Sequence, residues 1–331
     1  MNIDELHVEW DEKRLTPVKV MGVGGGGGYA VNYMYQQGIH GVSFVICNTD
    51  AGALEISPVP EKIRMGSLGL WCDPVSGYEA ALESLDKIRE TLDTSTEILF
   101  LVAGMGGSIG TGATPVIARV AKELGILTVA VVTIPFNFEG QARMEQAKQG
   151  VCELKNHVDS LIIINNERLH EINCDLSIND LFLKSDQKLL MTVKSIAEMI
   201  TIQGVINIDL KDMKTFMSNS GITVTGSGSA SGENRARDAV TSAIHSIFFN
   251  NIMNNIDARR IMLKIMSGSG ENEMKMDEVS EILNFVTGLI KNASMIWGVG
   301  IDDSFGDTLS VNIIVTDFIN NQNLINVNHN K

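Results

Sequence analysis

Two glycine-rich segments restrict the fold of this chain more than any other feature, because each follows an apolar run directly and precedes a helical one. The first extends from Gly22 to Gly28, and the second from Ala103 to Gly112. Glycine lets backbone N–H groups approach an anion without a Cβ in the way, and the start of the following helix adds partial positive charge. Both segments therefore predict phosphate-binding turns at the carboxyl ends of strands.

Two such turns at one edge of a parallel sheet can hold a polyphosphate from both sides. Neither segment contains the Gly-Lys-Ser/Thr of a Walker A motif, so no lysine is supplied in the turn. Backbone amides and a metal ion must then neutralise the phosphates, and Mg²⁺ is the expected ion.

Two other interpretations of the first segment stay open on sequence alone. Its spacing also fits G-x-G-x-x-G, which is typical of a nicotinamide-dinucleotide site with Asp50 as the ribose acid. Such a dehydrogenase would leave the second glycine segment without a purpose, and no histidine or lysine stands out as its acid. A glycine run can also be merely a tight turn, although five consecutive glycines are entropically expensive to order.

The order of apolar runs predicts an α/β fold. From Val18 onward, short β-branched runs alternate with helical segments, which indicates βαβ units and a parallel sheet of at least five strands. We expect helices over residues 29–37, 78–92, 115–124 and 139–157. Residues 177–203 have apolar side chains at helical spacing and would span on the order of 40 Å, enough to connect two domains. Four further strands and two helices, over 233–246 and 276–290, indicate a second α/β unit.

Composition excludes several classes of protein. The 331 residues include 26 Lys and Arg against 40 Asp and Glu, a net charge of −14, so a nonspecific nucleic-acid binder is not expected. The longest apolar runs have six to eight residues, well short of the roughly 20 needed to cross a bilayer, so we expect no direct membrane insertion. The four cysteines have no C-x-x-C spacing and the six histidines no i,i+4 pairing, which argues for a reducing compartment and against a zinc site.

A set of longer strings carries a family resemblance. They are VGGGGGYAV, CNTDA, AGMGGSIGTGA, AKELGILTVAVVT, PFNFEG, HVDSLIIINNERL, IAEMIT and INIDLKDMKTFMS. Over nearly its whole length the chain resembles the tubulin/FtsZ superfamily and, within it, the FtsZ family of bacterial cell-division GTPases. The resemblance implies GTP or GDP with Mg²⁺, head-to-tail homopolymers, a cytoplasmic location at the mid-cell division site, and adaptor proteins as further partners.

The resemblance also implies a division of the chain and a set of site residues. It implies a nucleotide-binding GTPase domain over 1–176, a core helix and catalytic loop over 177–208 and a C-terminal α/β domain over 209–318. Residues 319–331 hold six Asn with little periodicity, so we expect a disordered tail there. The implied nucleotide contacts are Gly25, Gly26, Gly27, Gly28, Tyr29, Gly106, Gly107, Ser108, Ile109, Gly110, Thr111, Gly112, Glu139, Arg143, Asn166, Phe182 and Asp186. The implied catalytic residues are Asn207, Asp209 and Asp212, which act on nucleotide bound by a neighbouring subunit.

Several of these residues have a simpler interpretation. Glu139 and Arg143 are spaced for an i,i+4 ion pair, and Phe182 on spacing alone is a core residue. Asp209 can be a helix N-cap and Asp212 a first-turn acid, which is the commoner fate of such residues.

The chain departs from the family pattern at three places. Tyr29 replaces an asparagine, Ser108 and Ile109 replace a glycine and a threonine, and the loop over 66–77 is shorter and bulkier than usual. The sequence also lacks the long linker and terminal peptide by which the family reaches membrane-bound adaptors, so tethering by that route is not expected. These departures predict slower turnover, and they motivate an alternative function as a filament protein that binds guanine nucleotide but hydrolyses it poorly.

Overall fold

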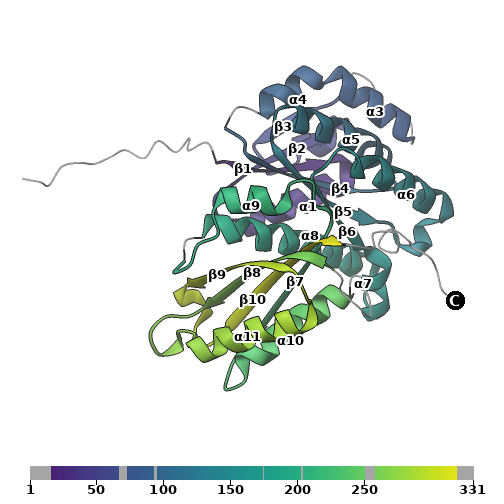
Figure 1. Cartoon of the computed structure of the whole chain (residues 1–331). Coiled ribbons are helices and arrows are strands. Elements are labelled where there is room, and N and C mark those ends of the chain that lie inside the picture. Colours follow the sequence, from purple (N-terminus) through teal and green to yellow (C-terminus); the bar gives the residue numbers. More distant parts are fainter. Residues whose placement is uncertain are drawn as a thin grey trace, which may run out of the picture.

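The computed structural model describes residues 16–66, 73–92, 95–173, 175–202, 204–249 and 258–318. Its framework is a ten-stranded sheet in the order β3-β2-β1-β4-β5-β6-β7-β10-β8-β9 (Figure 1). The first half is parallel and consists of β1 Val18–Val23, β2 Val42–Asn48, β3 Glu61–Arg64, β4 Ile98–Gly104, β5 Leu127–Ile134 and β6 Ser160–Asn165. It includes all five expected strands and adds β3, whose sequence EKIR carries a single apolar residue.

The second half of the sheet is mixed. It contains β7 Gly221–Ala230, β8 Ala258–Ser267, β9 Ser294–Ile301 and β10 Leu309–Phe318. β10 is antiparallel to both β7 and β8, whereas β9 is parallel to β8. The two halves are joined where β6 pairs with the start of β7, through Ser160–Gly221 and Leu161–Ile222.

The described helices follow most of the sequence expectations. They are α1 Gly24–Gln37, α2 Ala51–Glu55, α3 Pro74–Glu83, α4 Leu85–Thr91, α5 Ser108–Glu123, α6 Gln141–Lys155, α7 Asn166–Ile172, α8 Ile178–Thr201, α9 Leu210–Met217, α10 Arg235–Phe249 and α11 Met276–Leu289. The long helix expected over 177–203 is α8, which begins after Ser177 because the Ser177 side chain accepts the Asp180 N–H. The expected tail and most of the 66–77 loop lie outside the described residues.

Both glycine segments differ from the expectation that they are turns outside the helices. α1 begins at Gly24 rather than at residue 29, and α5 begins at Ser108 rather than at residue 115. The reason is close packing: a Cβ on Gly27 would lie 2.2 Å from the Val102 carbonyl oxygen, and one on Gly110 would lie 2.3 Å from that of Gly104. Only glycine lets these first helical turns approach the strand β4 so closely.

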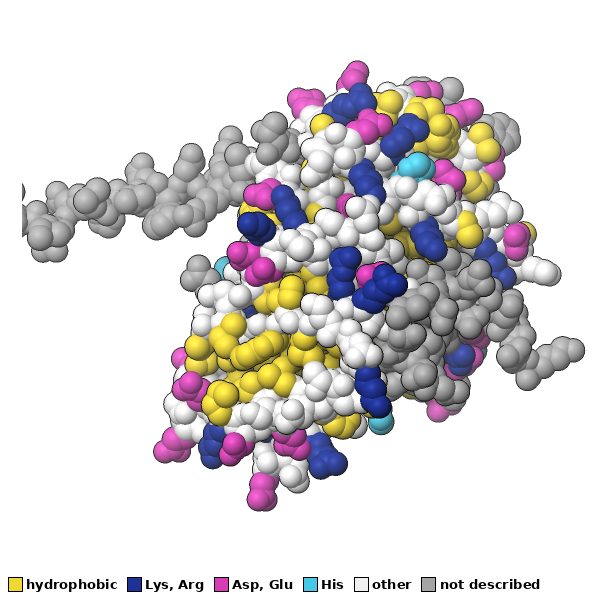
Figure 2. Space-filling model, viewed as in Figure 1, with side chains coloured by type: hydrophobic (Ala, Val, Ile, Leu, Met, Phe, Trp, Pro, Cys, Tyr) yellow, Lys and Arg dark blue, Asp and Glu magenta, His cyan; other side chains and the backbone are white. Residues whose placement is uncertain are grey.

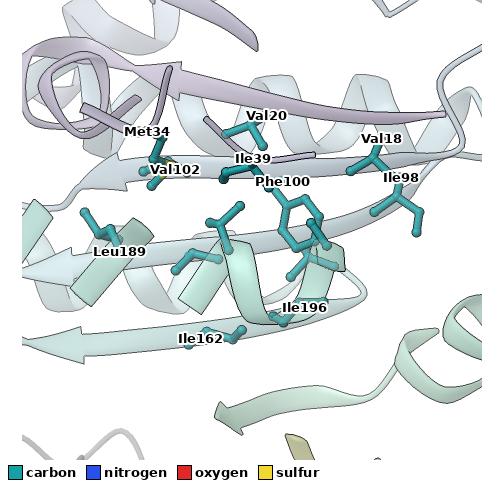
Figure 3. Packing of buried hydrophobic residues seen from close by; sticks show 14 of the residues in the cluster. Val18, Val20, Met34, Ile39, Ile98, Phe100, Val102, Ile162, Leu189 and Ile196 are labelled. Carbon is teal, nitrogen blue, oxygen red and sulfur yellow. The ribbon is translucent and has the colours of Figure 1, made fainter. Parts of the chain in front are cut away.

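The parallel strands are apolar on both faces because helices cover both sides of the sheet. On one face, Val18, Val20, Phe100 and Val102 pack with residues of α1 and with Leu189 and Ile196 of α8 (Figure 3). The same cluster includes Met262 of β8 and Ile314 of β10, so α8 contacts both halves of the sheet. The central helix therefore links the two halves through continuous apolar packing.

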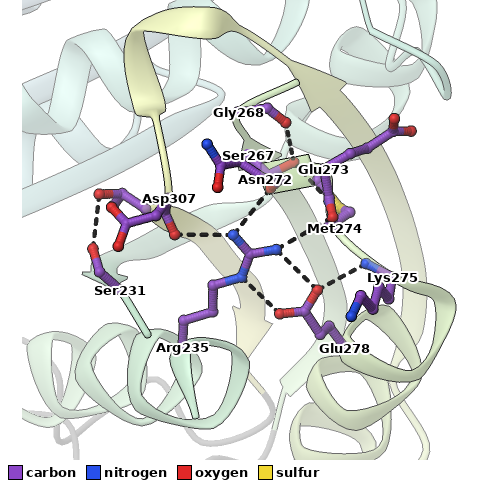
Figure 4. A network of polar contacts seen from close by, with 11 residues as sticks. Ser231, Arg235, Ser267, Gly268, Asn272, Glu273, Met274, Lys275, Glu278 and Asp307 are labelled. Atoms are coloured by element: carbon purple, nitrogen blue, oxygen red, sulfur yellow. Dashed lines mark hydrogen bonds and ion pairs between the residues drawn. The ribbon is translucent and has the colours of Figure 1, made fainter. Parts of the chain in front are cut away.

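A buried arginine organises the second half. Arg235, at the start of α10, forms a bidentate ion pair with Glu278 of α11 at 2.7 and 3.1 Å (Figure 4). Its guanidinium also donates to the carbonyl oxygens of Asn272, Glu273 and Asp307. One side chain thus joins α10, α11 and two loops.

The face of the molecule drawn in Figure 2 carries basic and acidic side chains interspersed, with no continuous basic patch among the described residues. None of the described helices combines the length and the apolar character that crossing a membrane requires.

Candidate functional site

A cavity of about 640 Å³ opens at the carboxyl edge of the parallel strands. One end is formed by the two glycine segments and the other by α7 and α8. Of the nucleotide contacts expected from the sequence, the lining includes Gly25, Gly26, Gly106, Gly107, Ser108, Ile109, Gly110, Glu139, Arg143, Asn166, Phe182 and Asp186. Residues more than 150 positions apart in the sequence are therefore brought to one site.

The two glycine segments contact one another at this cavity. A Cβ on Gly24 would lie 3.0 Å from the Gly110 amide nitrogen, and one on Gly26 would lie 3.6 Å from the Gly104 Cα. Gly24 and Gly106 have φ values of +73° and +97°, a backbone conformation that residues other than glycine rarely adopt. The segments thus form one continuous surface of exposed backbone.

This surface is an anion-binding arrangement. α1 and α5 both begin at the cavity, and their N-cap residues, Val23 and Gly107, form no side-chain hydrogen bond to the first turn. Neither first turn contains an acidic residue. The amides of the first turns therefore keep their donor capacity, and both helix dipoles direct partial positive charge at the cavity.

Arg143 places a full positive charge beside the same surface. A Cβ on Gly107 would lie 3.9 Å from the Arg143 Nη2 atom. Its Nη1 atom lies 3.2 Å from Glu139 Oε2, so the i,i+4 ion pair expected from spacing is present. Glu139 is in turn fixed by accepting the Phe136 N–H at 2.9 Å. The ion pair and a ligand-binding role are compatible, because both side chains line the cavity.

The opposite end of the cavity suits a flat polar ring. Phe182 is 42% exposed, so it is not the core residue that its spacing alone indicates, and it meets Phe136 edge-on at 5.3 Å. Asn166 is buried and accepts a hydrogen bond from Ser185 Oγ at 2.8 Å. Burial raises the pKa of Asp186 to about 6, so its carboxyl remains mostly ionised at neutral pH.

Ser185 is a site residue that the sequence analysis missed. It follows Phe182 by three positions and precedes Asp186, so all three occupy one face of α8. The i, i+3, i+4 spacing from Phe182 is the sequence pattern that places Ser185 on the same helix face as the two expected contacts.

Five expected contacts lie outside the lining of the cavity. They are Gly27, Gly28, Tyr29, Thr111 and Gly112. Thr111 Oγ1 accepts the Gly106 N–H at 2.8 Å and so braces the second glycine segment from behind. A Cβ on Gly112 would lie 1.9 Å from the Pro74 carbonyl oxygen, which makes this glycine a packing requirement between α3 and α5. Gly28 and Tyr29 instead border a small hollow beside Asn32 and Asn48, which adjoins the cavity at Gly25.

Ile109, which stands where the family has a threonine, has a buried side chain. It is 6% exposed and belongs to the apolar cluster on the outer face of the sheet. Its apolar side chain is stabilised in that cluster, and it also borders the first glycine segment, since a Cβ on Gly24 would lie 3.3 Å from the Ile109 Cγ2 atom.

Asn207, Asp209 and Asp212 lie at the opposite end of α8 from the cavity. Asp186 precedes the end of α8 by 15 residues, or roughly 23 Å of helix. Asp209 and Asp212 form a capping box at the start of α9, with Asp212 N–H donating to Asp209 Oδ1 at 2.7 Å. Asn207 Oδ1 accepts the Gly204 N–H at 2.6 Å. Asn207 and Asp209 are exposed, so this group faces solvent and does not enter the cavity of its own chain.

Among the described residues, no group of three or more His, Cys, Asp or Glu side chains is placed to hold a metal ion. The residues present nevertheless fit Mg²⁺ brought in with a nucleotide, because this ion commonly keeps several waters and is bound largely through substrate phosphates rather than by a protein cage. The uncapped amide surface is where such phosphates would lie.

Comparison with known families matches most of the chain. Residues 17–174 match the description "Tubulin/FtsZ family, GTPase domain", and residues 221–319 match "FtsZ family, C-terminal domain".

Individual proteins match over similar lengths. The Cell division protein FtsZ of Buchnera aphidicola subsp. Baizongia pistaciae is 43% identical over 90% of this chain and 78% of its own length. That of Porphyromonas gingivalis is 41% identical over 91% of this chain and 67% of its own length. Among solved structures, an empty FtsZ dimer from M. jannaschii aligns with a TM-score of 0.82 and 35% identity, covering 91% of this chain and 88% of the other.

Proposed function

This chain belongs to the FtsZ family within the tubulin/FtsZ superfamily, and from that premise we propose which of its residues bind and hydrolyse GTP. The family membership makes it a guanine-nucleotide-binding GTPase of the cell-division cytoskeleton that associates with itself. The alternative of a filament protein that hydrolyses poorly is not favoured. The proposed roles divide between a phosphate end, a base end and a neighbouring subunit.

At the phosphate end, the first-turn amides of α1 and α5 bind the phosphate oxygens, and Arg143 adds charge beside them. These groups are fixed before the nucleotide arrives, since the two glycine segments are locked by contact with β4 and with each other. Preorganised donors of this kind stabilise the charge that develops during phosphoryl transfer. Mg²⁺, when bound with the nucleotide, supplies further neutralisation of the β- and γ-phosphates.

At the base end, Asp186 accepts hydrogen bonds from the N1–H and 2-amino groups of guanine, and Asn166 contacts the same edge. Phe182 lies against the face of the ring. Gly27, Thr111 and Gly112 support the site through packing and a hydrogen bond, and Gly28 and Tyr29 border the hollow next to it. Guanine is favoured over adenine because adenine offers no donor at N1 to a carboxylate.

Hydrolysis requires a second subunit. The cavity and the exposed acids lie at opposite ends of α8, so a head-to-tail contact brings Asp209 and Asp212 of one subunit to the nucleotide of the next. There the carboxylates orient and polarise the attacking water, while Asn207 holds the preceding loop. The single observation that carries this proposal is the separation of an amide-lined cavity from a solvent-facing acid pair within one chain.

The test is GTP turnover per subunit at increasing protein concentration. Turnover per subunit should rise steeply and then level off, because only assembled subunits are active. Asp212→Asn keeps an oxygen for the capping box but removes the charge, so GTP binding should persist while turnover falls about 100-fold or more. Turnover that is independent of concentration, or an Asp212→Asn variant that is fully active, would overturn the proposal.

We further propose that the filaments assemble at mid-cell and contact adaptor proteins of the division site. The support is the name "Cell division protein" shared by the relatives. A fluorescent fusion of the full chain should form a mid-cell band, and diffuse fluorescence in dividing cells would count against this.

A further inference from the structure

Lys264 occupies an unusual position for a lysine. It is 2% exposed and lies in the middle of β8, in the second half of the sheet. Its Nζ atom donates to the carbonyl oxygens of Met199, at 3.2 Å, and Ile202, at 2.9 Å. These are carbonyls at the end of α8, which have no partner within the helix, and a cation is favourable at the negative end of the helix dipole.

The carboxylate of Glu198 favours the charged form of Lys264. Burial lowers the pKa of Lys264, and the carboxylate of Glu198, one turn before the helix end, opposes that shift. Glu198 is also paired with Lys194 at 3.6 Å. Burying an amine is unfavourable unless its donors are satisfied, so the two carbonyl contacts account for the tolerance of a lysine at this position.

The loop that follows α8 is held by the same half of the sheet. Ile206 and Val299 of β9 exchange backbone hydrogen bonds at 3.1 and 3.0 Å. A Cβ on Gly204 would lie 2.2 Å from the Val299 carbonyl oxygen, so the loop lies directly against the edge strand β9. Lys264 fixes the beginning of this loop and β9 its middle, and the loop ends at Asp209.

We propose that Lys264 is a positioning residue for GTP hydrolysis: it ties the end of α8 to β8 and thereby orients the loop that presents Asp209 and Asp212 to the neighbouring subunit. The inference rests on the proposed role of these two acids. Lys264 does not touch nucleotide, because it lies at the end of α8 far from the cavity that contains Asp186. Its effect therefore appears in turnover and not in nucleotide affinity.

The test compares Lys264→Met with a matched control, Lys19→Met, in the full chain. Lys19 is also buried, in β1; its Nζ atom donates to the Thr91 carbonyl oxygen at 2.8 Å and pairs with Glu61 at 3.3 Å, and neither partner belongs to α8 or to the loop that follows it. The measurements are affinity for a fluorescent GTP analogue at a protein concentration below assembly, turnover in fully assembled protein, and amide hydrogen exchange. A misplacement of about 1 Å can cost about 100-fold in rate, so a turnover loss of about tenfold or more is expected for Lys264→Met.

Lys264→Met should bind the analogue within about twofold of the unaltered protein and should exchange the Ile206 amide faster. Lys264→Arg keeps the donors and the charge and should restore turnover. Lys19→Met should retain turnover, although both lysine-to-methionine variants lose thermal stability. If Lys264→Met does not fold, Lys264→Gln, which keeps a shorter donor, replaces it in the same comparison.

Asp212→Asn, assayed in parallel, distinguishes failure of the role of Lys264 from failure of the proposed function. Loss of turnover in Asp212→Asn together with full turnover in folded Lys264→Met or Lys264→Gln would overturn the role of Lys264 alone. An active Asp212→Asn variant would overturn the proposed function itself. An equal loss of turnover in Lys19→Met and Lys264→Met would show that Lys264 only stabilises the fold, and would overturn its positioning role.

Discussion

Asp186 makes the affinity for GTP depend on pH in a direction that the structure fixes. Burial raises its pKa to about 6, and only the ionised carboxylate accepts both guanine donors well. The ionised fraction falls from about nine-tenths at pH 7 to about one-tenth at pH 5, so the dissociation constant should rise about tenfold over that range. Above pH 7 it should change little.

The assay is equilibrium titration with a fluorescent GTP analogue under conditions that prevent assembly. Asp186→Asn is the control, because it keeps the size of the side chain and the titration of the phosphates but removes the carboxylate. Losing a charge-assisted hydrogen bond costs about 1.5 to 3 kcal/mol, so this variant should bind GTP about 10- to 150-fold more weakly at pH 7. The ratio of the two dissociation constants should shrink towards pH 5.

A change of nucleotide provides a second check on the same carboxylate. Xanthosine triphosphate has a carbonyl oxygen where guanine has its 2-amino group, so it repels a carboxylate but accepts from an asparagine amide. Asp186→Asn should therefore prefer xanthosine triphosphate to GTP. The assignment would be refuted by a ratio that is constant from pH 5 to 7, or by a variant that keeps its preference for GTP.

Three further predictions concern stability and packing. Arg235→Met should lower the free energy of unfolding by about 3 kcal/mol because it leaves Glu278 without its ion-pair partner, measurable by urea denaturation. The Arg235 hydrogen bonds lower the pKa of Glu278 from 4.5, so protonation of Glu278 removes the stabilising effect of the ion pair as the pH falls below about 4.5. Over that range the free energy of unfolding should decrease more in the unaltered protein than in Glu278→Gln. Gly112→Ala should be strongly destabilising, because its Cβ would lie 1.9 Å from the Pro74 carbonyl oxygen. Gly288→Ala in α11 has open space around its Cβ, so thermal unfolding should show a stabilisation of about 0.5 to 1 kcal/mol. Ile109→Thr restores the hydroxyl of the family but should lower the free energy of unfolding by about 2 kcal/mol, since the side chain lies in the apolar cluster. Turnover should not rise; faster turnover would show that the side chain at this position reaches the phosphates.

The sequence predicts the α/β fold and the long central helix well for physical reasons. α8 has a Ser177 cap and a long apolar periodicity, so its start is predicted to within a residue and its end to within two. The first strands are continuous apolar runs because both faces are covered. β3 was missed because a four-residue edge strand with one apolar side chain has no periodic signal.

The site was predicted less completely, because packing decides which residues face it. Glycine runs have no helical periodicity, so nothing in the sequence showed that α1 and α5 begin within them. Ile109 turns into the core and Tyr29 borders another hollow, facts that depend on how α5 and α1 are rotated. The contact of Lys264 with the end of α8 is set by tertiary packing between elements more than 60 residues apart.

Mixing two defective variants, at a GTP concentration too low to fill the Asp186→Asn cavity, measures most directly whether one subunit completes the site of the next. Asp212→Ala keeps an intact cavity but lacks an acid, whereas Asp186→Asn keeps the acids but binds GTP weakly. In an equal mixture about a quarter of the contacts pair an intact cavity with an intact acid loop, so turnover should recover to about a quarter of that of the unaltered protein. Turnover no greater than the sum of the separate variants, in mixtures shown by sedimentation to co-assemble, would contradict the account.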